Sequence, residues 1–246
     1  MSKDKITFVS LVPGLSDVQP VYEGKRYDTK WMNAARQDYK SAMSKQMNPN
    51  HIMQCPGIFD LYSYGYIVPM WHDVMIKTEG PDTPFKWMAP NIESLEIDGV
   101  TSPVGKHEPD IVKYLPRRHY SIKGVVKFNT PWRIIAPKGV KFLMLPLSYA
   151  DNSNFDASIG VLDPGVSNEI NVQVNWNVLT GETMIKQGTP LCHLIPITEN
   201  KYEYEVRDAT DNDILWEKKK NFFMNMSFFP KRNIIKEAWH KHFGKK

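Results

Sequence analysis

Hydrophobic and polar side chains alternate strictly from residue 170 to residue 178. The apolar members are Ile170, Val172, Val174, Trp176 and Val178, and the polar members are Asn171, Gln173, Asn175 and Asn177. A period of two residues is typical of a β-strand whose apolar face is buried. Because the polar face carries amides and no charge, we interpret it as the lining of a pocket or of a subunit interface. A solvent-facing strand that happens to lack charge is the alternative.

Short apolar segments separated by turn residues fill most of the remaining chain. We expect strands at residues 6–13, 66–69, 73–78, 85–88, 121–128, 131–137, 138–146 and 190–197. The third and fourth of these fit a hairpin through the turn EGPDTP. Regularly spaced short strands favour a mainly β fold of the sandwich or barrel type, and aromatic residues at 12% of the sequence agree with it.

Three segments have the pattern of a helix. Residues 28–47 place apolar side chains along one stripe, and Asp28 or Thr29 is suited to cap the start. A shorter helix is expected from Pro56, and Gly65 is expected to end it. The C-terminal segment reads as an amphipathic helix, whose apolar stripe comprises Ile234, Ile235, Ala238 and Trp239.

These patterns divide the chain into three parts. They are an N-terminal extension with a helix at 1–65, a β domain at 66–200, and a charged linker with a basic amphipathic tail at 201–246. The net charge is +4, yet residues 217–246 carry eight lysines, one arginine and only two glutamates. The basic character therefore belongs to the tail and says little about the β domain.

The tail mixes its cations with aromatic side chains, which are Phe222, Phe223, Phe228, Phe229 and Trp239. Cations and aromatics together suit single-stranded nucleic acid. They also suit an amphipathic tail that docks onto a partner subunit and leaves its lysines in water. We favour docking, with nucleic-acid binding through the tail as the alternative.

The number of cysteines and the lengths of the apolar runs indicate the cellular compartment in which the protein is expected. Cys55 and Cys192 are too few for a disulfide framework, and the N-terminus MSKDKITFVS lacks the apolar stretch of a secretory signal. No apolar run approaches the length of a membrane helix, so we expect a soluble protein of a reducing compartment with no membrane partner. We expect no metal site, because His240 and His242 would point to opposite sides of a helix.

Four pieces of the segment 131–197 occur in the order found in one enzyme superfamily. They are IIAPKGVKFLMLP, PLSYA, GVLDPGVSNEINV and IKQGTPLCHLIPI. In order and spacing they resemble the dUTPase and dCTP deaminase superfamily, the trimeric β-clip nucleotide hydrolases. The resemblance implies a dUTPase-like β-clip, a distorted jelly-roll barrel, with short N- and C-terminal helices added here. It also implies a homo-oligomer, with a trimer as the form the family adopts.

Two further pieces, CPGIFDLYSYGYIVP and FNTPWRIIAPKG, are similar to a family of phage and bacterial proteins that shares this β core. That family carries no established activity. The resemblance therefore implies a phage-type protein, located in the cytoplasm of a host cell or in a virion, whose partners are itself or other phage proteins.

The dUTPase resemblance can be carried over residue by residue. It implies that Asp163 activates the attacking water and that Ser148 contacts a phosphate, with Mg²⁺ as the cofactor only if the protein is a nucleotide hydrolase. The phosphate-binding arginine of the family is replaced by Leu147, and the tyrosine under the deoxyribose by Val166. The catalytic glutamate of the deaminase branch is replaced by Gln173, and the glycine-rich C-terminal arm is absent.

We therefore expect a degenerate β-clip that acts as a non-catalytic binding or assembly module. The candidate ligand-binding residues are Ser148, Asn171, Gln173 and Asn175. The first alternative is a divergent deoxynucleotide triphosphate pyrophosphatase that uses Asp163, with Arg133 or Lys186 as the replacement cation. The second is a virion structural protein. An Asp-Pro-Gly turn also has a purely structural interpretation, because its carboxylate bonds to nearby backbone N–H groups.

Overall fold

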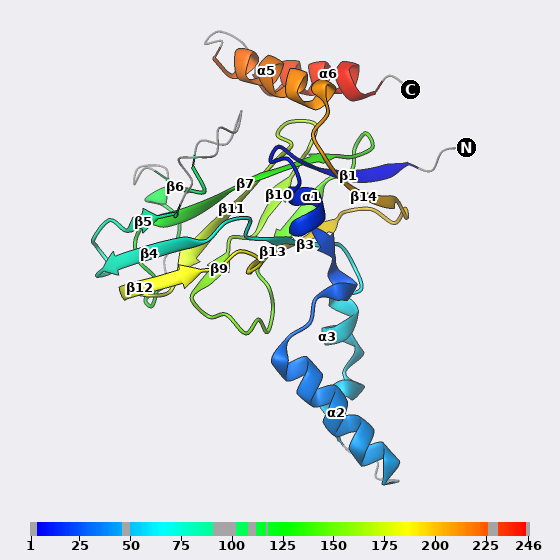
Figure 1. Ribbon diagram of the computed structural model, residues 1–246, viewed down its shortest axis with the longest axis vertical. Coiled ribbons are helices and arrows are strands. Elements are labelled where there is room, and N and C mark those ends of the chain that lie inside the picture. The colour runs from blue at the N-terminus through cyan, green and yellow to red at the C-terminus, as the bar shows by residue number, and fades with distance from the viewer. Residues whose placement is uncertain are drawn as a thin grey trace.

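The computed structural model describes residues 4–45, 50–90, 102–107, 112–116, 118–225 and 231–244. These parts of the chain form a mainly β body with three sheets and two helical projections (Figure 1). The prediction of a mainly β fold is confirmed. Among the described residues the strands do not close into a barrel.

The largest sheet has six strands in the order β14-β1-β7-β11-β9, with β6 paired to β7. Its strands are β1 (Lys5–Ser10), β6 (Val104–Lys106), β7 (Val125–Ile135), β9 (Phe155–Ala157), β11 (Glu169–Trp176) and β14 (Glu203–Asp208). The expected strands at 121–128 and 131–137 are one continuous strand, β7. It pairs with three strands, with β11 along one edge and with β1 and β6 at different points along the other, which explains its length.

The predicted alternation is confirmed in β11. Ile170, Val172, Val174 and Trp176 are fully buried, whereas Gln173 is exposed. The apolar face therefore builds the core, where each large side chain contributes about 1.5–3 kcal/mol through burial.

The second sheet has five strands in the order β10-β8-β13-β3-β2, and the third has three in the order β12-β4-β5. Their strands are β2 (Tyr22–Glu23), β3 (Tyr66–Pro69), β4 (Val74–Glu79), β5 (Lys86–Met88), β8 (Phe142–Leu145), β10 (Gly160–Leu162), β12 (Thr180–Ile185) and β13 (Pro190–Pro196). The hairpin expected through EGPDTP is confirmed by the pairing of β4 with β5. All three sheets share one hydrophobic core, which includes Phe8, Phe128, Phe142, Trp132 and Ile76.

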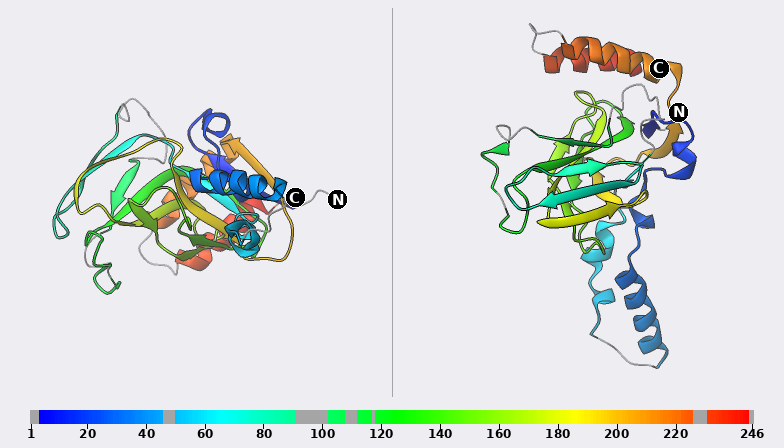
Figure 2. Two further views of the ribbon diagram at one scale, coloured as in Figure 1. Left: turned by 90° about the horizontal axis from the view of Figure 1, so that it is seen from below. Right: turned by 60° about the vertical axis from the view of Figure 1, so that its left-hand side comes forward.

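An N-terminal helical arm projects from one end of the β body (Figures 1 and 2). It contains α2 (Lys30–Ser44), η2 (Ile52–Gln54) and α3 (Pro56–Leu61), and it follows α1 (Leu15–Val18) and η1 (Gly24–Arg26). Thr29 caps α2 by accepting a hydrogen bond from the Met32 N–H at 3.3 Å, and Pro56 starts α3. Both helices were predicted from the sequence, and of the two expected caps, Asp28 and Thr29, the structure has Thr29.

A C-terminal helical hairpin lies at the opposite end of the molecule (Figure 2). It consists of α5 (Asp211–Asn225) and α6 (Lys231–Phe243). The expected stripe of α6 is confirmed, since Ile235 and Trp239 are buried in a small cluster with Trp216 of α5. Helix α5 was not expected.

The expected charged linker after residue 200 contains a strand. β14 pairs in parallel with β1, from Lys5 opposite Glu203 to Ser10 opposite Asp208. The alternation Glu203, Tyr204, Glu205, Val206 carries a period of two that the high charge of the segment conceals. The three-part division of the chain stays a prediction, although β1 and β14 both join the sheet of the β domain.

Candidate functional site

Asp163 lies in the turn between β10 and β11, where its carboxylate is engaged locally. Its Oδ1 accepts a hydrogen bond from the Gly165 N–H at 3.1 Å, and its carbonyl accepts from Val166 and Ser167 at 2.9 and 3.0 Å. This is the arrangement expected for an Asp-Pro-Gly turn. The structural interpretation of Asp163 therefore has direct geometric support.

Helix α6 packs over this turn and supplies a cation. Lys236 Nζ lies 3.6 Å from Asp163 Oδ2, and the Asp163 side chain is only 14% exposed. His240 lies beside the same turn, where burial together with the positive charges of Lys138 and Lys236 lowers its pKa, against the opposing effect of Asp163. The Asp163 carboxylate thus faces helix α6 and pairs with Lys236 of that helix, and it does not face an open nucleotide cleft.

Ser148 lies far from Asp163 along the five-stranded sheet. Leu162, next to Asp163, pairs with Phe142 at the start of β8, whereas Ser148 follows the end of that strand. The Ser148 carbonyl accepts a hydrogen bond from the Tyr62 hydroxyl, which anchors its loop to the helical arm. Within one chain, the structure therefore does not bring together Asp163 and Ser148, the two residues that the dUTPase resemblance assigns to one site.

The loop after β8 is held by the arm at a second point. Tyr149 has a positive φ of 57°, and its carbonyl accepts a hydrogen bond from Trp31 Nε1 at 2.7 Å. The Asp151 carboxylate accepts another from the Lys30 N–H at 3.1 Å. Through these contacts the segment 146–150, which was expected to bind phosphate, and the adjacent Asp151 hold the helical arm against the β body.

The amide face of β11 lies on the outer side of the six-stranded sheet. Asn171 donates a hydrogen bond to Glu169 Oε2 at 3.0 Å, Gln173 is exposed, and Asn175 is partly exposed. Asn177, beyond the strand, donates to the Asp156 carboxylate at 3.1 Å. The amides share one face as predicted, but the carboxylate of Asp163 points to α6 and makes none of these contacts.

Four charged side chains, three of them buried and one partly exposed, join α5 to the six-stranded sheet, and we call this group the charge cluster. Its members are Arg133 of β7, Glu169 of β11, and Glu217 and Lys220 of α5. Lys220 Nζ lies 2.6 Å from Glu169 and 2.7 Å from Glu217, and Arg133 Nε lies 3.1 Å from Glu217. The two cations balance the two anions, as buried charges require.

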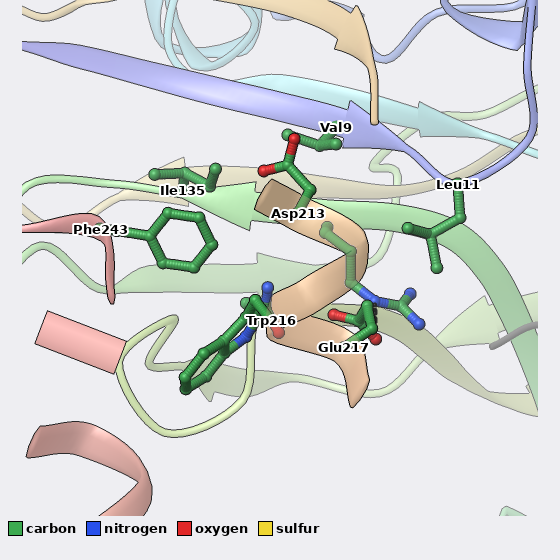
Figure 3. Close-up of a pocket in the computed structure, with 9 residues that line it drawn as sticks. Val9, Leu11, Ile135, Asp213, Trp216, Glu217 and Phe243 are labelled. Carbon is green, nitrogen blue, oxygen red and sulfur yellow. Dashed lines mark ion pairs between the residues drawn. The ribbon is translucent and has the colours of Figure 1, made fainter. Parts of the chain in front are cut away.

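The charge cluster borders a small cavity of about 10 Å³ between the sheet and the hairpin (Figure 3). Figure 3 shows Asp213, Trp216 and Glu217 projecting from one helix beside Val9 and Leu11. A space of this size holds about one water molecule and no organic ligand. Arg133 is committed to this cluster, so it does not serve as the replacement cation near Asp163, and Lys236 takes that position instead.

The outer face of the five-stranded sheet presents an aliphatic patch. Its members are Leu143, Leu145, Ile159, Val161, Ile195 and Ile197. Val161, Leu143 and Ile195 lie side by side in the strand register. Ile159, Val161 and Ile197 are 69%, 60% and 54% exposed. The patch continues to β10, the end strand of the sheet in the part of the chain that the structure describes.

The arm covers only the other half of this sheet face. Tyr62 stacks on His193 with 5.3 Å between ring centroids, and it packs with Ile67, Tyr27 and Met32 in a separate cluster. The aliphatic patch lies beyond this cover. This patch was not predicted, although FLML and IGVL are runs without a polar residue, and a strand through such a run places apolar side chains on both of its faces.

Several aromatic and basic residues of the tail make contacts within the same chain. Trp239 is buried, Lys220 belongs to the charge cluster, and Lys236 pairs with Asp163. Phe228 and Phe229 lie outside the described residues, as do the side-chain surroundings of Phe223. Docking onto a partner subunit and binding of nucleic acid both stay predictions.

No group of three or more His, Cys, Asp or Glu side chains that could hold a metal ion occurs among the residues that the structure covers. Within the same residues, no helix combines the length and apolar character needed to cross a membrane. No family model matches the sequence, and no curated protein matches it significantly.

Proposed function

We propose that this protein is a non-catalytic assembly module, a phage-type chain with a degenerate dUTPase-like β-clip core that associates with copies of itself. The aliphatic patch beside an open sheet edge is the observation that carries the proposal. Burial of its exposed side chains in an interface contributes about 25 cal/mol for each Å² of apolar surface removed from water. An exposed apolar face of this kind marks a site of protein association.

The edge strand β10 points to a second copy as the partner. The segment 157–162, ASIGVL, carries no charge, whereas exposed edges usually carry lysine, proline or a bulge that blocks pairing. Because the strand is neutral, pairing of β10 with its own copy brings no like charges together. A two-fold arrangement also places the aliphatic patch of each copy in one continuous interface.

The surroundings of Asp163 support an assembly role over hydrolysis. A water-activating carboxylate needs access to substrate and a cationic environment for the triphosphate. In this protein one carboxylate oxygen of Asp163 accepts a hydrogen bond from the Gly165 N–H, and the other lies against Lys236 of α6. A virion structural protein is compatible with the same interface, and the chain would then be found in purified particles.

Sedimentation velocity tests the assembly proposal directly. We expect wild-type protein at micromolar concentration to sediment as an oligomer and Val161→Glu to sediment as a monomer, because the new charge lies in the centre of the patch. Val18→Glu is the matched control, since Val18 is 73% exposed on α1, away from the patch, and it should leave the oligomer intact. A wild-type monomer at tens of micromolar protein, or an oligomer unaffected by Val161→Glu, contradicts the proposal.

A further inference from the structure

Three methionine side chains form a line across the three-stranded sheet, one from each strand, and we call this line the methionine row. Met184 of β12 lies opposite Met75 of β4, and Met75 lies opposite Met88 of β5. Residues directly opposite each other in antiparallel strands project to the same face of the sheet. The three thioethers are therefore neighbours on one face of a sheet that lies at one side of the β body (Figure 1).

The methionine row is on the outer face of this sheet. Val74 and Ile76, which flank Met75 in β4, are fully buried in the core, so Met75 projects to the opposite face. Met88 and Met184 are 55% and 45% exposed, and Met75 is partly exposed. Three sulfur atoms from three strands are thus presented to solvent together.

The spacing of the row lets the three sulfur atoms converge on one ion. Directly opposite residues have Cβ atoms about 4.5–5.5 Å apart, so the two outer methionines lie about 10 Å apart with Met75 between them. A methionine side chain is unbranched and has three rotatable bonds, so it adapts its shape readily. The thioethers of Met88 and Met184 can therefore turn toward the central sulfur and enclose a small cation.

Thioether sulfur is a soft ligand without charge. Among metal ions it selects Cu(I), whereas carboxylate and carbonyl oxygens suit Mg²⁺, Ca²⁺ and Mn²⁺. The expectation of no metal site rested on histidine and cysteine spacing, and it did not concern thioethers. A row of three sulfur ligands is therefore suited to Cu(I) and poorly suited to the hard divalent ions.

The charges beside the row do not repel a cation, because they are matched. The next residues on the same face are Lys77, with Glu182 opposite it on one side and Lys86 on the other. Lys77 Nζ lies 3.2 Å from the Glu182 carboxylate, and Lys86 Nζ lies 3.6 Å from the Glu79 carboxylate. Two lysines thus face two glutamates, and the local charge beside the methionines sums to zero.

We propose that the methionine row is a binding site for Cu(I), held by the thioether sulfurs of Met75, Met88 and Met184. Thioethers carry no proton to release, so the affinity should stay constant between about pH 6 and pH 8, unlike that of a site built from histidine or thiol ligands. The site is separate from the aliphatic patch, because it is built on β4, β5 and β12 instead of β8 and β10.

The probe is Cu(I) itself, added as its acetonitrile complex in the absence of oxygen. Cys55 is an exposed free thiol and would compete for the ion, so the parent protein for this test is Cys55→Ser. The readout is the methyl resonances of ¹³C-labelled methionine, of which the chain has twelve. We expect the resonances of the methionine row to shift until about one equivalent is bound, each being identified by its loss in a leucine variant.

Met75→Leu and Met184→Leu test the ligands directly. Leucine has a similar volume and keeps the face apolar, so both variants should fold. Each should weaken Cu(I) binding by more than the roughly tenfold that loss of an outer-shell contact to a metal ligand costs. Met43→Leu is the matched control, since Met43 is 50% exposed on α2, away from this sheet, and it should bind Cu(I) like the parent. Met88→Leu provides a further test if Met75→Leu does not fold.

The proposal is overturned if the resonances of the methionine row do not move with Cu(I), or if the leucine variants of the row bind the ion as tightly as the parent. An affinity that falls steeply as the pH is lowered from 8 to 6 would also contradict it, because that result would assign the ion to histidine. Val161→Glu leaves the methionine row unchanged, so Cu(I) binding by this variant tests the site independently of the assembly proposal.

Discussion

The ammonium group of Lys220 lies 2.6 Å from the Glu169 carboxylate, and this contact fastens the C-terminal hairpin to β11. Lys220 also contacts Glu217 at 2.7 Å, and Arg133 contacts Glu217 from β7. Among the described residues, the apolar cluster of the hairpin is small, and its buried members are Trp216, Ile235 and Trp239. The charge cluster is therefore a main contact of α5 with the sheet, together with the ion pair between Asp213 of α5 and Arg207 of β14 at 2.6 Å.

Replacing Lys220 by methionine should lower the free energy of unfolding by about 3 kcal/mol, because two carboxylates in a buried site lose their shared cation. Urea unfolding at pH 7 measures the difference. Lys218→Met is the matched control on the same helix, where the side chain is exposed, and its effect should stay within about 0.5 kcal/mol. Equal effects of the two variants would mean that the cluster adds no stability.

The pKa of Glu169 predicts a pH dependence of stability. Burial alone would raise this pKa above its ordinary value of 4.5. The opposing effect of Arg133 and Lys220 is larger, and the pKa is lowered to about 2. The folded state therefore binds this proton more weakly than the unfolded state. The contribution of Glu169 is fully present above pH 4.5 and is lost as the pH falls toward 2.

This dependence is measurable by chemical unfolding at several pH values from 6 down to the acid limit of the folded protein. In Glu169→Gln the free energy of unfolding should fall less steeply over the acid range than in wild type, because one titrating group is gone. Glu182→Gln, an exposed glutamate on β12, serves as the control and should keep the wild-type slope. An unchanged slope in Glu169→Gln would show that the carboxylate is not held in its charged form.

Asp163→Asn should leave nucleotide chemistry unaffected, because we expect none in the wild-type protein. The measurement is release of pyrophosphate or phosphate from each deoxynucleoside triphosphate with Mg²⁺. Asp17→Asn, on an exposed position of α1, is the control for nonspecific effects. Turnover by wild type that disappears only in Asp163→Asn would establish the hydrolase alternative. The lost ion pair with partly exposed Lys236 should cost less than about 1 kcal/mol.

Gly65→Ala should destabilise the protein by at least about 2 kcal/mol. Gly65 has a φ of +68°, and an added Cβ would lie 2.2 Å from the Leu194 carbonyl oxygen, so the base of the arm would have to move off β13. Gly139→Ala is the control, since that residue also has a positive φ of 89° but nothing within 4 Å of the added Cβ. Thermal unfolding should show a larger loss at position 65; equal losses would reduce the effect to backbone strain alone.

Local patterns predicted the elements that depend on local physics. The period of two in β11 and the apolar stripe of α6 follow from burial of one face, and both appear in the structure. Thr29 and Pro56 mark helix starts because a hydroxyl can accept a backbone N–H and proline tolerates the first turn. None of these predictions needed knowledge of distant contacts.

The charge cluster could not be predicted in the same way, because its members come from two strands and a helix separated by tens of residues. Glu217 and Lys220 looked like surface charges of a basic tail, yet both are buried against β7 and β11. Helix α5 lacks a clear apolar stripe because its inward face carries ionic groups around Trp216. The same lack of long-range information hid the engagement of Asp163 by Lys236.

The parallel pairing of β1 with β14 joins two strands that lie far apart in the sequence, with Lys5 opposite Glu203. During synthesis β1 cannot form this pairing until residues 203–208 have been made. A nascent chain therefore carries an unpaired strand edge until that point, and contacts of such long sequence separation form slowly. Early termination before residue 203 would leave that edge permanently open to intermolecular pairing.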